Sequence, residues 1–536
     1  MFLDASRTLR RVPRTAGPRI APDLIAIGVF AIVLAAAAAA RQSFNGDGIR
    51  HVAAAIAAAR PPIGEARWVL FPTLVWILVH PLAAAGWFGN AEQAARPLVA
   101  LTVAAGIVYL AAIRAWLRTR GDDAWRRAAA VALAGSTAPF LLLYSDFEEP
   151  AIAAAAIVAV LAYAAARQRR TESIAPVVLV TAIIAAASLV YEALILALAL
   201  LPLCVDTRTL TRRSTAAAVA FTIAAAIGVA IGARVYAGDS ARAAALSLAR
   251  GETNPFTRAF MGTPSPAKWA IALIGGPAQG FAALRRFAGV PALAAAIGDP
   301  DSRPDALANA LRLALGIALA IALGWSIIVR RNWRLALAIG GIVALPIVRN
   351  NQYGYAKFYV LWPAVAAIGS TAFAPSEVIA AAALLLASNG WLLASDIYDG
   401  RQGHAEAEAI YAGGPANACF FTAGWTAPFP ILWRGRTAAV ALTLSEGTEP
   451  RAQEVALTRT LDECFCDSAA VWTDTTAESR RAVELLEEQF HYRQIDLGSL
   501  LAPADGRTQL GSGVLHLYAY TPARAADACR RIRARP

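Results

Sequence analysis

The stretch APDLIAIGVFAIVLAAAAAA, residues 21–40, is the first apolar run of the chain and decides its fold class. Its length matches the roughly 20 residues that an α-helix needs to cross a bilayer. Five arginines precede it, and no convincing cleavage site of a secretory signal peptide follows it. Because basic residues favour the cytoplasmic side, the run predicts a start-transfer helix whose N-terminal tail, residues 1–20, stays in the cytoplasm.

The composition of all 536 residues extends this prediction to most of the chain. Hydrophobic residues make up 58% of it and the mean hydropathy is +0.50, whereas soluble domains are about 45 to 50% apolar. The formal charge is +12, and Lys268 and Lys357 are the only lysines among the basic residues. Basic residues of multi-pass proteins gather in cytoplasmic loops. The excess therefore indicates a multi-pass protein of the cell inner (plasma) membrane and no nucleic-acid partner.

The positive-inside tendency selects one topology among those that hydropathy allows. If residues 68–86 crossed the membrane, the basic segment 114–127 would lie outside, so we expect residues 68–86 to form an interfacial helix on the outer surface. Five basic clusters then lie on the cytoplasmic side. Residues 270–289 could form a re-entrant segment. This topology predicts about 11 transmembrane helices, near residues 21–40, 97–116, 127–144, 151–166, two short helices within 174–205, 215–236, 307–329, 335–348, 358–372 and 377–394.

Beyond the tail, the chain divides into two predicted domains. A polytopic α-helical transmembrane domain covers residues 21–394 and includes a first outer loop, residues 41–96, with juxtamembrane helices. Residues 395–536 contain charged residues, turns and no stretch long enough to span, which predicts a soluble extracytoplasmic α/β domain. Its expected elements are a helix at 475–489 and strands at 469–473 and 514–520.

Four of the five cysteines, Cys419, Cys464, Cys466 and Cys529, lie in this outer domain, where disulfides form if the compartment is oxidising. Spacing alone leaves their pairing open. A bridge between Cys464 and Cys466 would be strained, which favours Cys419 and Cys529 as partners. A zinc site is the second reading, but Cys-x-Cys without another close pair or a nearby His is a weak zinc motif.

Four polar patches lie at the outer face in this topology, although none is adjacent to another in the sequence. They are Asp47 with Arg50 and His51, Asp146 with Glu148 and Glu149, Tyr191 with Glu192, and residues 349–357. Acidic residues from several helix ends could bind a divalent cation such as Mg²⁺ or Mn²⁺, or place a general base beside a substrate. The cation ligands would then be Asp47, Asp146 and Glu149. Solvation is the plainer reading for any single loop charge. The candidate site residues are Asp47, Arg50, His51, Asp146, Glu148, Glu149, Tyr191, Glu192, Arg349, Tyr353 and Lys357.

Asp47 is the candidate catalytic carboxylate. It lies in a polar patch just beyond the first apolar run, and an Asp with a His four residues later is a poor membrane anchor. If residues 47–60 are helical, Asp47 and His51 share one face of the helix. Two roles compete for Asp47, because an Asp at the start of a helix also serves as an N-cap.

Five short stretches carry a resemblance. They are Asp47-Gly48-Ile49-Arg50-His51, Phe71-Pro72-Thr73-Leu74-Val75-Trp76, Ala94-Ala95-Arg96-Pro97, the turn Asp146–Pro150 and Lys357-Phe358-Tyr359-Val360-Leu361-Trp362-Pro363. In this order they resemble the GT-C superfamily of integral-membrane glycosyltransferases, particularly the bacterial branch related to protein mannosyltransferases and aminoarabinose transferases. The resemblance covers residues 21–394. The chain departs from the pattern at Gly48, where many members carry a second acid, and at Lys357, which replaces the commoner arginine.

The resemblance implies transfer of a sugar from a polyprenyl-phosphate-linked donor to an envelope glycan, lipid or protein at the outer membrane face, with inversion. Asp47 would accept the proton of the acceptor hydroxyl as general base. Arg349 or Lys357 would stabilise the departing phosphate, and Asp146 and Glu149 would orient the acceptor or hold a cation. A multi-span transporter or flippase of a lipid-linked or polar substrate is the alternative, although the chain shows no convincing internal repeat.

Overall fold

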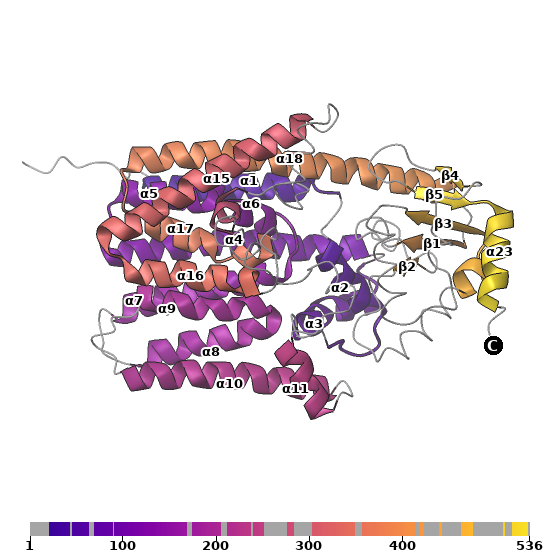
Figure 1. Ribbon diagram of the computed structural model, residues 1–536, viewed down its shortest axis with the longest axis horizontal. Coiled ribbons are helices and arrows are strands. Elements are labelled where there is room, and N and C mark those ends of the chain that lie inside the picture. Colours follow the sequence, from indigo (N-terminus) through magenta and orange to yellow (C-terminus); the bar gives the residue numbers. More distant parts are fainter. Residues whose placement is uncertain are drawn as a thin grey trace, which may run out of the picture.

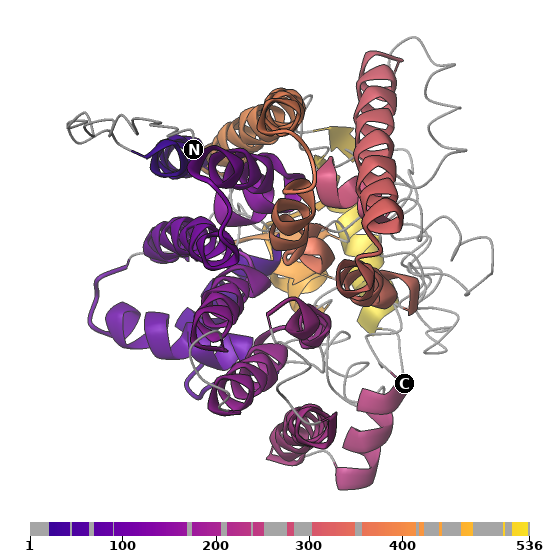
Figure 2. The ribbon, with the colours of Figure 1, turned by 90° about the vertical axis from the view of Figure 1, so that its left-hand side faces the viewer.

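The computed structural model of the protein is predominantly helical, with a small sheet near the C-terminus (Figure 1). Its long helices run along one direction, and Figure 2 views them nearly end-on. The polytopic helical class with a C-terminal α/β part is confirmed. The structure describes residues 21–42, 46–63, 69–88, 91–168, 174–204, 212–236, 240–250, 276–282, 303–348, 356–413, 417–422, 439–441, 462–474, 507–509 and 517–533.

In the part of the chain that the structure describes, six helices are long and apolar enough to cross a membrane. A seventh span results if α5 (Ala124–Ser136) and α6 (Ala138–Tyr144), which are bent by 64°, count as one. The side chain of Leu311 is 74% exposed, as expected where a helix faces lipid. The six helices are α1 (Pro22–Ala40), α4 (Ala91–Arg120), α7 (Glu149–Gln168), α10 (Arg212–Tyr236), α15 (Arg303–Arg330) and α18 (Pro375–Gly413).

The other four of the predicted spans are helical but shorter. α17 (Trp362–Ser370) lies where residues 358–372 were expected to span, and its nine residues are all buried. Nine residues extend about 14 Å, roughly half the thickness of the hydrocarbon core. This helix therefore fills the interior of the bundle. The remaining three are α8 (Ala175–Val190), the unit of η1 (Glu192–Leu200) with α9 (Leu201–Cys204), and α16 (Trp333–Val348).

The bend between α5 and α6 is stabilised by one amide side chain. Pro139, in the first turn of α6, has no N–H to continue the hydrogen-bond ladder. Asn389 of α18 is buried and donates from Nδ2 to the carbonyls of Ser136 and Phe281, both at 2.8 Å. Phe281 belongs to residues 276–282, a buried helical segment inside the stretch considered as re-entrant. Asn389 thus joins the bend to this segment.

We expect Asn389→Leu to lower the stability of the purified protein by about 1 to 3 kcal/mol, because two buried carbonyls lose their donor. The melting temperature in detergent measures this effect. Leu384→Ala is the matched control, since Leu384 lies on the same helix and its side chain is 59% exposed. Equal melting temperatures for Asn389→Leu and the wild type would contradict the assigned role of the amide.

At the end of the bundle away from the sheet, one buried acid joins three helices. Asp23 lies in the first turn of α1, and its Oδ2 is 3.0 Å from Arg114 Nε and 2.7 Å from Arg127 Nε. Arg114 belongs to α4, and Arg127 lies in the first turn of α5. Basic residues of the segment 114–127 therefore lie beside the start of α1, as the predicted topology requires. The side of the membrane on which this end lies stays a prediction.

The segment predicted to be the first outer loop forms two helices, α2 (Gly46–Ala57) and α3 (Phe71–Ala84), at the end of the bundle that faces the sheet (Figure 1). Trp76 of α3 donates from Nε1 to the carbonyl of Ala58 at 2.9 Å, just beyond the end of α2. One face of α3 is buried, with Val75 and Val79, whereas large apolar side chains of the opposite face are exposed. Its 14 residues extend about 21 Å, too short to span, as expected for the predicted interfacial helix.

α18 leads from the bundle directly to the sheet. It continues for 39 residues, so residue 395, the predicted start of the outer domain, lies inside this helix. Hydropathy marks where the apolar residues end, and the helix continues with polar ones. Arg401 of this extension donates from Nε to the carbonyl of Ala40, the last residue of α1, at 2.8 Å.

The sheet has five strands in the order β2-β1-β3-β5-β4. β1 pairs in parallel with β2 and β3, while β5 pairs antiparallel with β3 and β4. β3 and β5 correspond to the predicted strands at 469–473 and 514–520, whereas the predicted helix at 475–489 lies outside the described residues. The strands are β1 (Ala418–Thr422), β2 (Ala439–Ala441), β3 (Ala470–Asp474), β4 (Arg507–Gln509) and β5 (Leu517–Tyr520).

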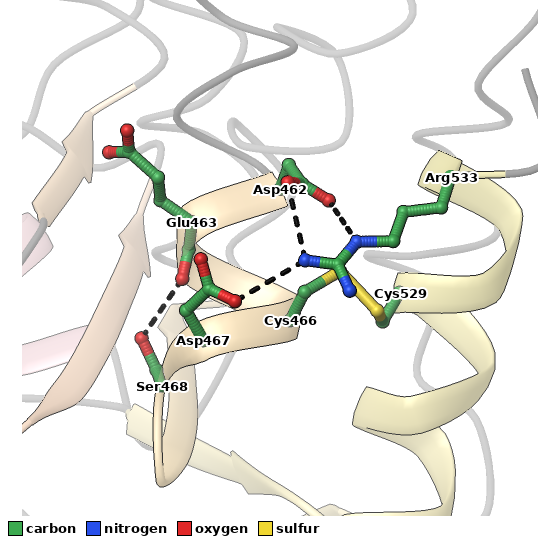
Figure 3. Close-up of a disulfide and its surroundings, with 7 residues drawn as sticks. All are labelled: Asp462, Glu463, Cys466, Asp467, Ser468, Cys529 and Arg533. Atoms are coloured by element: carbon green, nitrogen blue, oxygen red, sulfur yellow. Dashed lines mark hydrogen bonds and ion pairs between the residues drawn. A yellow bond between two sulfur atoms is a disulfide. The ribbon is translucent and has the colours of Figure 1, made fainter.

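Two disulfides link this domain, Cys419–Cys464 and Cys466–Cys529. Figure 3 shows the second of them. The favoured pairing of Cys419 with Cys529 is therefore wrong. Cys464 and Cys466 lie in a helical segment, residues 462–467, where side chains two positions apart point in nearly opposite directions. One cysteine can thus reach β1 while the other reaches α23 (Pro522–Arg533).

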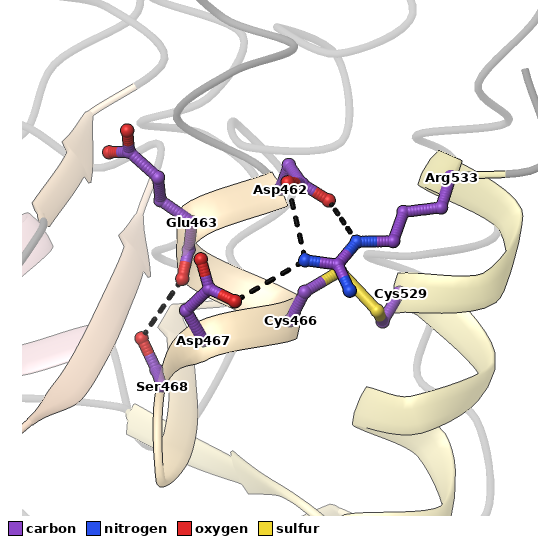
Figure 4. Close-up of polar contacts among 7 residues, drawn as sticks. All are labelled: Asp462, Glu463, Cys466, Asp467, Ser468, Cys529 and Arg533. Atoms are coloured by element: carbon purple, nitrogen blue, oxygen red, sulfur yellow. Dashed lines mark hydrogen bonds and ion pairs between the residues drawn. A yellow bond between two sulfur atoms is a disulfide. The ribbon is translucent and has the colours of Figure 1, made fainter.

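Arg533 reinforces the link between α23 and the helical segment (Figure 4). Its Nε lies 2.8 Å from Asp462 Oδ1, and its Nη2 lies 3.3 Å from Asp467 Oδ1. The hydrogen bond and the charge of Asp462 raise the pKa of Arg533 above its ordinary value. The guanidinium therefore stays charged at every pH at which the protein is handled.

Thiol labelling tests the two disulfides. Under denaturing, non-reducing conditions we expect only Cys204 to react with a maleimide, and all five cysteines to react after reduction. Mass spectrometry of the unreduced digest should show peptides joined through Cys419 and Cys464 and through Cys466 and Cys529. A product that joins the peptides of Cys419 and Cys529 without the peptide of Cys464 and Cys466 would contradict the structure.

Candidate functional site

The acidic turn, residues 145–149, connects α6 to α7 and brings three buried carboxylates together. Asp146, Glu148 and Glu149 are 3%, 2% and 1% exposed. Glu149 opens α7, where the positive end of the helix dipole favours an acidic residue. Carboxylates buried this deeply remain charged only when cations compensate them.

Lys357 is the first of these cations. It lies in the 3₁₀ helix η3 (Ala356–Tyr359) and is 8% exposed. Its Nζ lies 2.7 Å from Glu148 Oε2 and donates a hydrogen bond of 2.8 Å to Glu149 Oε2. Two of the four predicted patches are therefore in direct contact.

Arg41 is the second cation. It follows the last residue of α1, and its Nη1 lies 3.2 Å from Asp146 Oδ2. Its Nε also donates to the carbonyl of Ser145 at 3.0 Å. Arg41 thereby connects the end of the first span to the acidic turn. It precedes the turn in the sequence, whereas Lys357 follows it.

The start of α2 packs directly on the acidic turn. Gly48 is buried, and a Cβ atom placed on it would lie 2.0 Å from the carbonyl oxygen of Phe147. Only a glycine permits this approach. Asp47 precedes Gly48, so the backbone of the predicted catalytic residue lies beside the turn. Because α2 begins at Gly46, Asp47 is inside the first turn of the helix and not at the N-cap position.

His51 lies one helical turn after Asp47 and contacts the acidic turn. Its Nε2 lies 3.9 Å from Glu149 Oε1. Its ring meets Phe71 of α3 edge-on, with 5.1 Å between centroids, and Phe71 stacks on Phe147 at 5.6 Å. Since α2 is helical, Asp47 and His51 share a face as predicted.

The described ion pairs of this cluster join three carboxylates to two permanent cations. Arg41 pairs with Asp146, and Lys357 pairs with Glu148 and Glu149. Pairing of this kind offsets the cost of burying the carboxylates.

Tyr191 and Glu192 lie at the break between α8 and η1, where Tyr191 is extended with φ −151° and ψ 119°. The break is tied to α3, because the N–H of Leu70 donates to the carbonyl of Leu189 at 2.8 Å. The next residue of the chain, Phe71, contacts His51. The third predicted patch is therefore joined to the cluster through the start of α3.

Arg349 and Tyr353 lie outside the described residues, as do the side chains of Asp47 and Arg50. Within the described residues, no group of three or more His, Cys, Asp or Glu side chains could hold a metal ion. The predicted cation set of Asp47, Asp146 and Glu149 includes a side chain outside them, so this site stays a prediction. The two described members are already in contact with Arg41 and Lys357.

Two solved structures are similar to this chain. They are ArnT from Cupriavidus metallidurans bound to undecaprenyl phosphate and ArnT from the same organism in the apo state, at 15% and 16% sequence identity. The TM-scores are 0.40 and 0.41, and each comparison covers 94% of this chain and 98% of the ArnT chain. No family model matches the chain, and no curated protein matches it. At this distance from ArnT, the roles of residues rest on the geometry of this chain alone.

Two residues that build the cluster were not identified as such from the sequence. Arg41 lies just beyond the end of the first span, on the side predicted to be extracytoplasmic. A basic residue there runs against the positive-inside tendency, and this exception could have identified Arg41 as a candidate site residue. Gly48 was noted only as a departure from the GT-C pattern. Its contact with Phe147 is tertiary, between residues about 100 positions apart, and no local signal announces it.

Proposed function

We propose that this protein is a membrane glycosyltransferase that moves a sugar from a polyprenyl-phosphate-linked donor to an envelope glycan, lipid or protein. One observation carries the proposal: the start of α2, the acidic turn and Lys357 meet in one buried cluster. These are three of the stretches on which the resemblance to GT-C glycosyltransferases rests. They come from distant parts of the sequence, and surface solvation does not account for their burial.

The proposed reaction is a single displacement at the anomeric carbon of the donor sugar. The acceptor hydroxyl oxygen forms the new bond to this carbon while the bond to the phosphate oxygen breaks, and the phosphate leaves with the electron pair. Asp47 accepts the hydroxyl proton, which is general-base catalysis with a typical contribution of about 10²- to 10⁴-fold. Arg349 is the cation proposed to stabilise the leaving phosphate.

The proposed orientation places this cluster at the extracytoplasmic face of the inner membrane, with the N-terminus in the cytoplasm. It is supported by the Asp23 cluster, which gathers the arginines of the segment 114–127 at the end of the bundle where α1 begins. Basic residues favour the cytoplasmic side. The acidic turn and Arg41, which follows the other end of α1, then lie toward the extracytoplasmic side.

The test uses the full-length protein in lipid nanodiscs with a panel of radiolabelled polyprenyl-phosphate sugars and an extract of envelope glycans and lipids. We expect label to move from one donor to a product that no longer extracts with the polyprenyl lipid. Repeating the assay after treatment with EDTA decides whether a divalent cation takes part. Label that stays on the donor with every sugar, together with donor movement across liposome membranes, would favour the transporter or flippase instead.

A further inference from the structure

The predicted role of Lys357 as a ligand of the donor phosphate conflicts with its surroundings. Lys357 is 8% exposed, and its ammonium lies within 2.8 Å of two carboxylates, which are themselves almost completely buried. A lysine ammonium has three N–H donors. A phosphate that bound Lys357 would have to displace the two glutamates from the ammonium, or add its own negative charge beside their carboxylates.

Without Lys357, Glu148 and Glu149 would be two adjacent buried carboxylates. Removing one partner of a buried ion pair leaves an uncompensated charge, which is much more destabilising than removing the whole pair. Arg41 has the same relation to Asp146 on the other side of the turn. The two cations are Arg41, directly after α1, and Lys357 of η3, so the turn is held between elements from opposite ends of the transmembrane sequence.

The acidic turn in turn supports α2. Phe147 lies between Asp146 and Glu148 in the sequence. Its carbonyl oxygen is so close to Gly48 that residue 48 has no room for a Cβ atom. Displacement of this carbonyl by a fraction of an ångström would change the packing of α2 at the residue next to Asp47. Misplacement of a reacting group by about 1 Å can cost roughly 10²-fold in rate.

We infer that Lys357 is a positioning residue: with Arg41 it holds the acidic turn, and through the Phe147 carbonyl and Gly48 it holds Asp47, without contacting the donor phosphate. The inference rests on the proposed function for the role of Asp47. The contact between Lys357 and the two glutamates, and its effect on folding, do not depend on that function.

A charge-compensation cycle in the full-length protein tests it, with the variants Lys357→Met, Glu148→Gln and Lys357→Met/Glu148→Gln. We expect Lys357→Met to lower the melting temperature by at least about 5 °C, and the double variant to recover at least half of this loss. Lys357→Arg should be closer to the wild type than Lys357→Met. Arg96→Met is the control. Arg96 pairs with Glu92, but the side chain of Arg96 is 51% exposed, and exposed ion pairs contribute little to stability.

Binding of undecaprenyl phosphate, followed by thermal shift or by retention of radiolabelled lipid, separates the two roles of Lys357. We expect the dissociation constant of the double variant to stay within about threefold of the wild type, while the transfer rate of Lys357→Met falls at least about tenfold. A dissociation constant raised tenfold or more in both variants would overturn the inference and assign Lys357 to the phosphate. A double variant no more stable than Lys357→Met would also overturn the inference.

If the wild type binds no polyprenyl phosphate and transfers no sugar, the proposed function fails. The melting temperatures would still decide whether Lys357 holds the turn.

Discussion

Asp47→Asn is expected to lower the rate of sugar transfer by at least about 10²-fold while leaving the melting temperature within about 2 °C of the wild type. The amide has nearly the shape of the carboxylate but cannot accept the proton of the acceptor hydroxyl. The structure places Asp47 inside the first turn of α2 and not at its N-cap. Asn is accepted at the start of a helix about as well as Asp, so a residue with only a structural role there would tolerate the substitution. Initial rates at saturating donor and acceptor measure the difference.

The chain offers a matched control for this experiment. Asp123 is the N-cap of α5, and its Oδ1 accepts from the backbone N–H groups of Trp125 and Arg126, both at 2.9 Å. The hydrogen bond from Arg126 holds the pKa of Asp123 below its ordinary value. Asp123→Asn should therefore keep both the cap and normal transfer. Near-normal turnover of Asp47→Asn would remove Asp47 from the mechanism.

Gly48→Ala is expected to have the second large effect, on both stability and transfer. The new Cβ atom would lie 2.0 Å from the Phe147 carbonyl oxygen and 3.1 Å from the carbonyl carbon of the same residue. Either α2 or the acidic turn must move, and overpacking of this kind typically costs about 1 to 3 kcal/mol. Because Asp47 is the neighbouring residue, we expect transfer by the folded fraction to fall at least about 10²-fold.

The control for this variant is Gly28→Ala, at a helical position in α1 where no atom lies within 4 Å of the added Cβ. Alanine is the better helix former, so Gly28→Ala should be neutral or slightly stabilising. Melting temperatures and transfer rates of the two variants should be compared in the same detergent. If Gly48→Ala melted and turned over like Gly28→Ala, the packing of α2 on the acidic turn would be refuted.

Local features of the sequence predicted most of the helices. The apolar run 174–205 was expected to form two short helices, and the structure separates them at Tyr191, beside the polar residue Glu192. The predicted third span became the bent pair α5–α6, since Pro139 prevents a straight helix. Such features depend on composition and on residues a few positions apart, which a sequence displays directly.

The candidate site was only partly predictable for the opposite reason. The predicted topology placed the acidic turn, His51 and Lys357 on one side of the membrane, and in the structure His51 and Lys357 both lie against the acidic turn. It could not reveal which cation meets which carboxylate, because this depends on the packing of α1, α7 and η3 against one another. The disulfide pairing was unpredictable for the same reason. Cys419 pairs with Cys464 because a helical segment turns Cys464 toward β1.

The unbroken course of α18 has a mechanical consequence. A helix of 39 residues measures about 58 Å, roughly twice the thickness of the hydrocarbon core, so a large part of it extends past the bundle as a stiff lever. Its fulcrum includes the hydrogen bond from Arg401 to the carbonyl of Ala40, one residue before Arg41. A torque applied to the sheet is thereby transmitted through the part of α18 nearest the sheet to Ala40, the neighbour of Arg41, which pairs with Asp146.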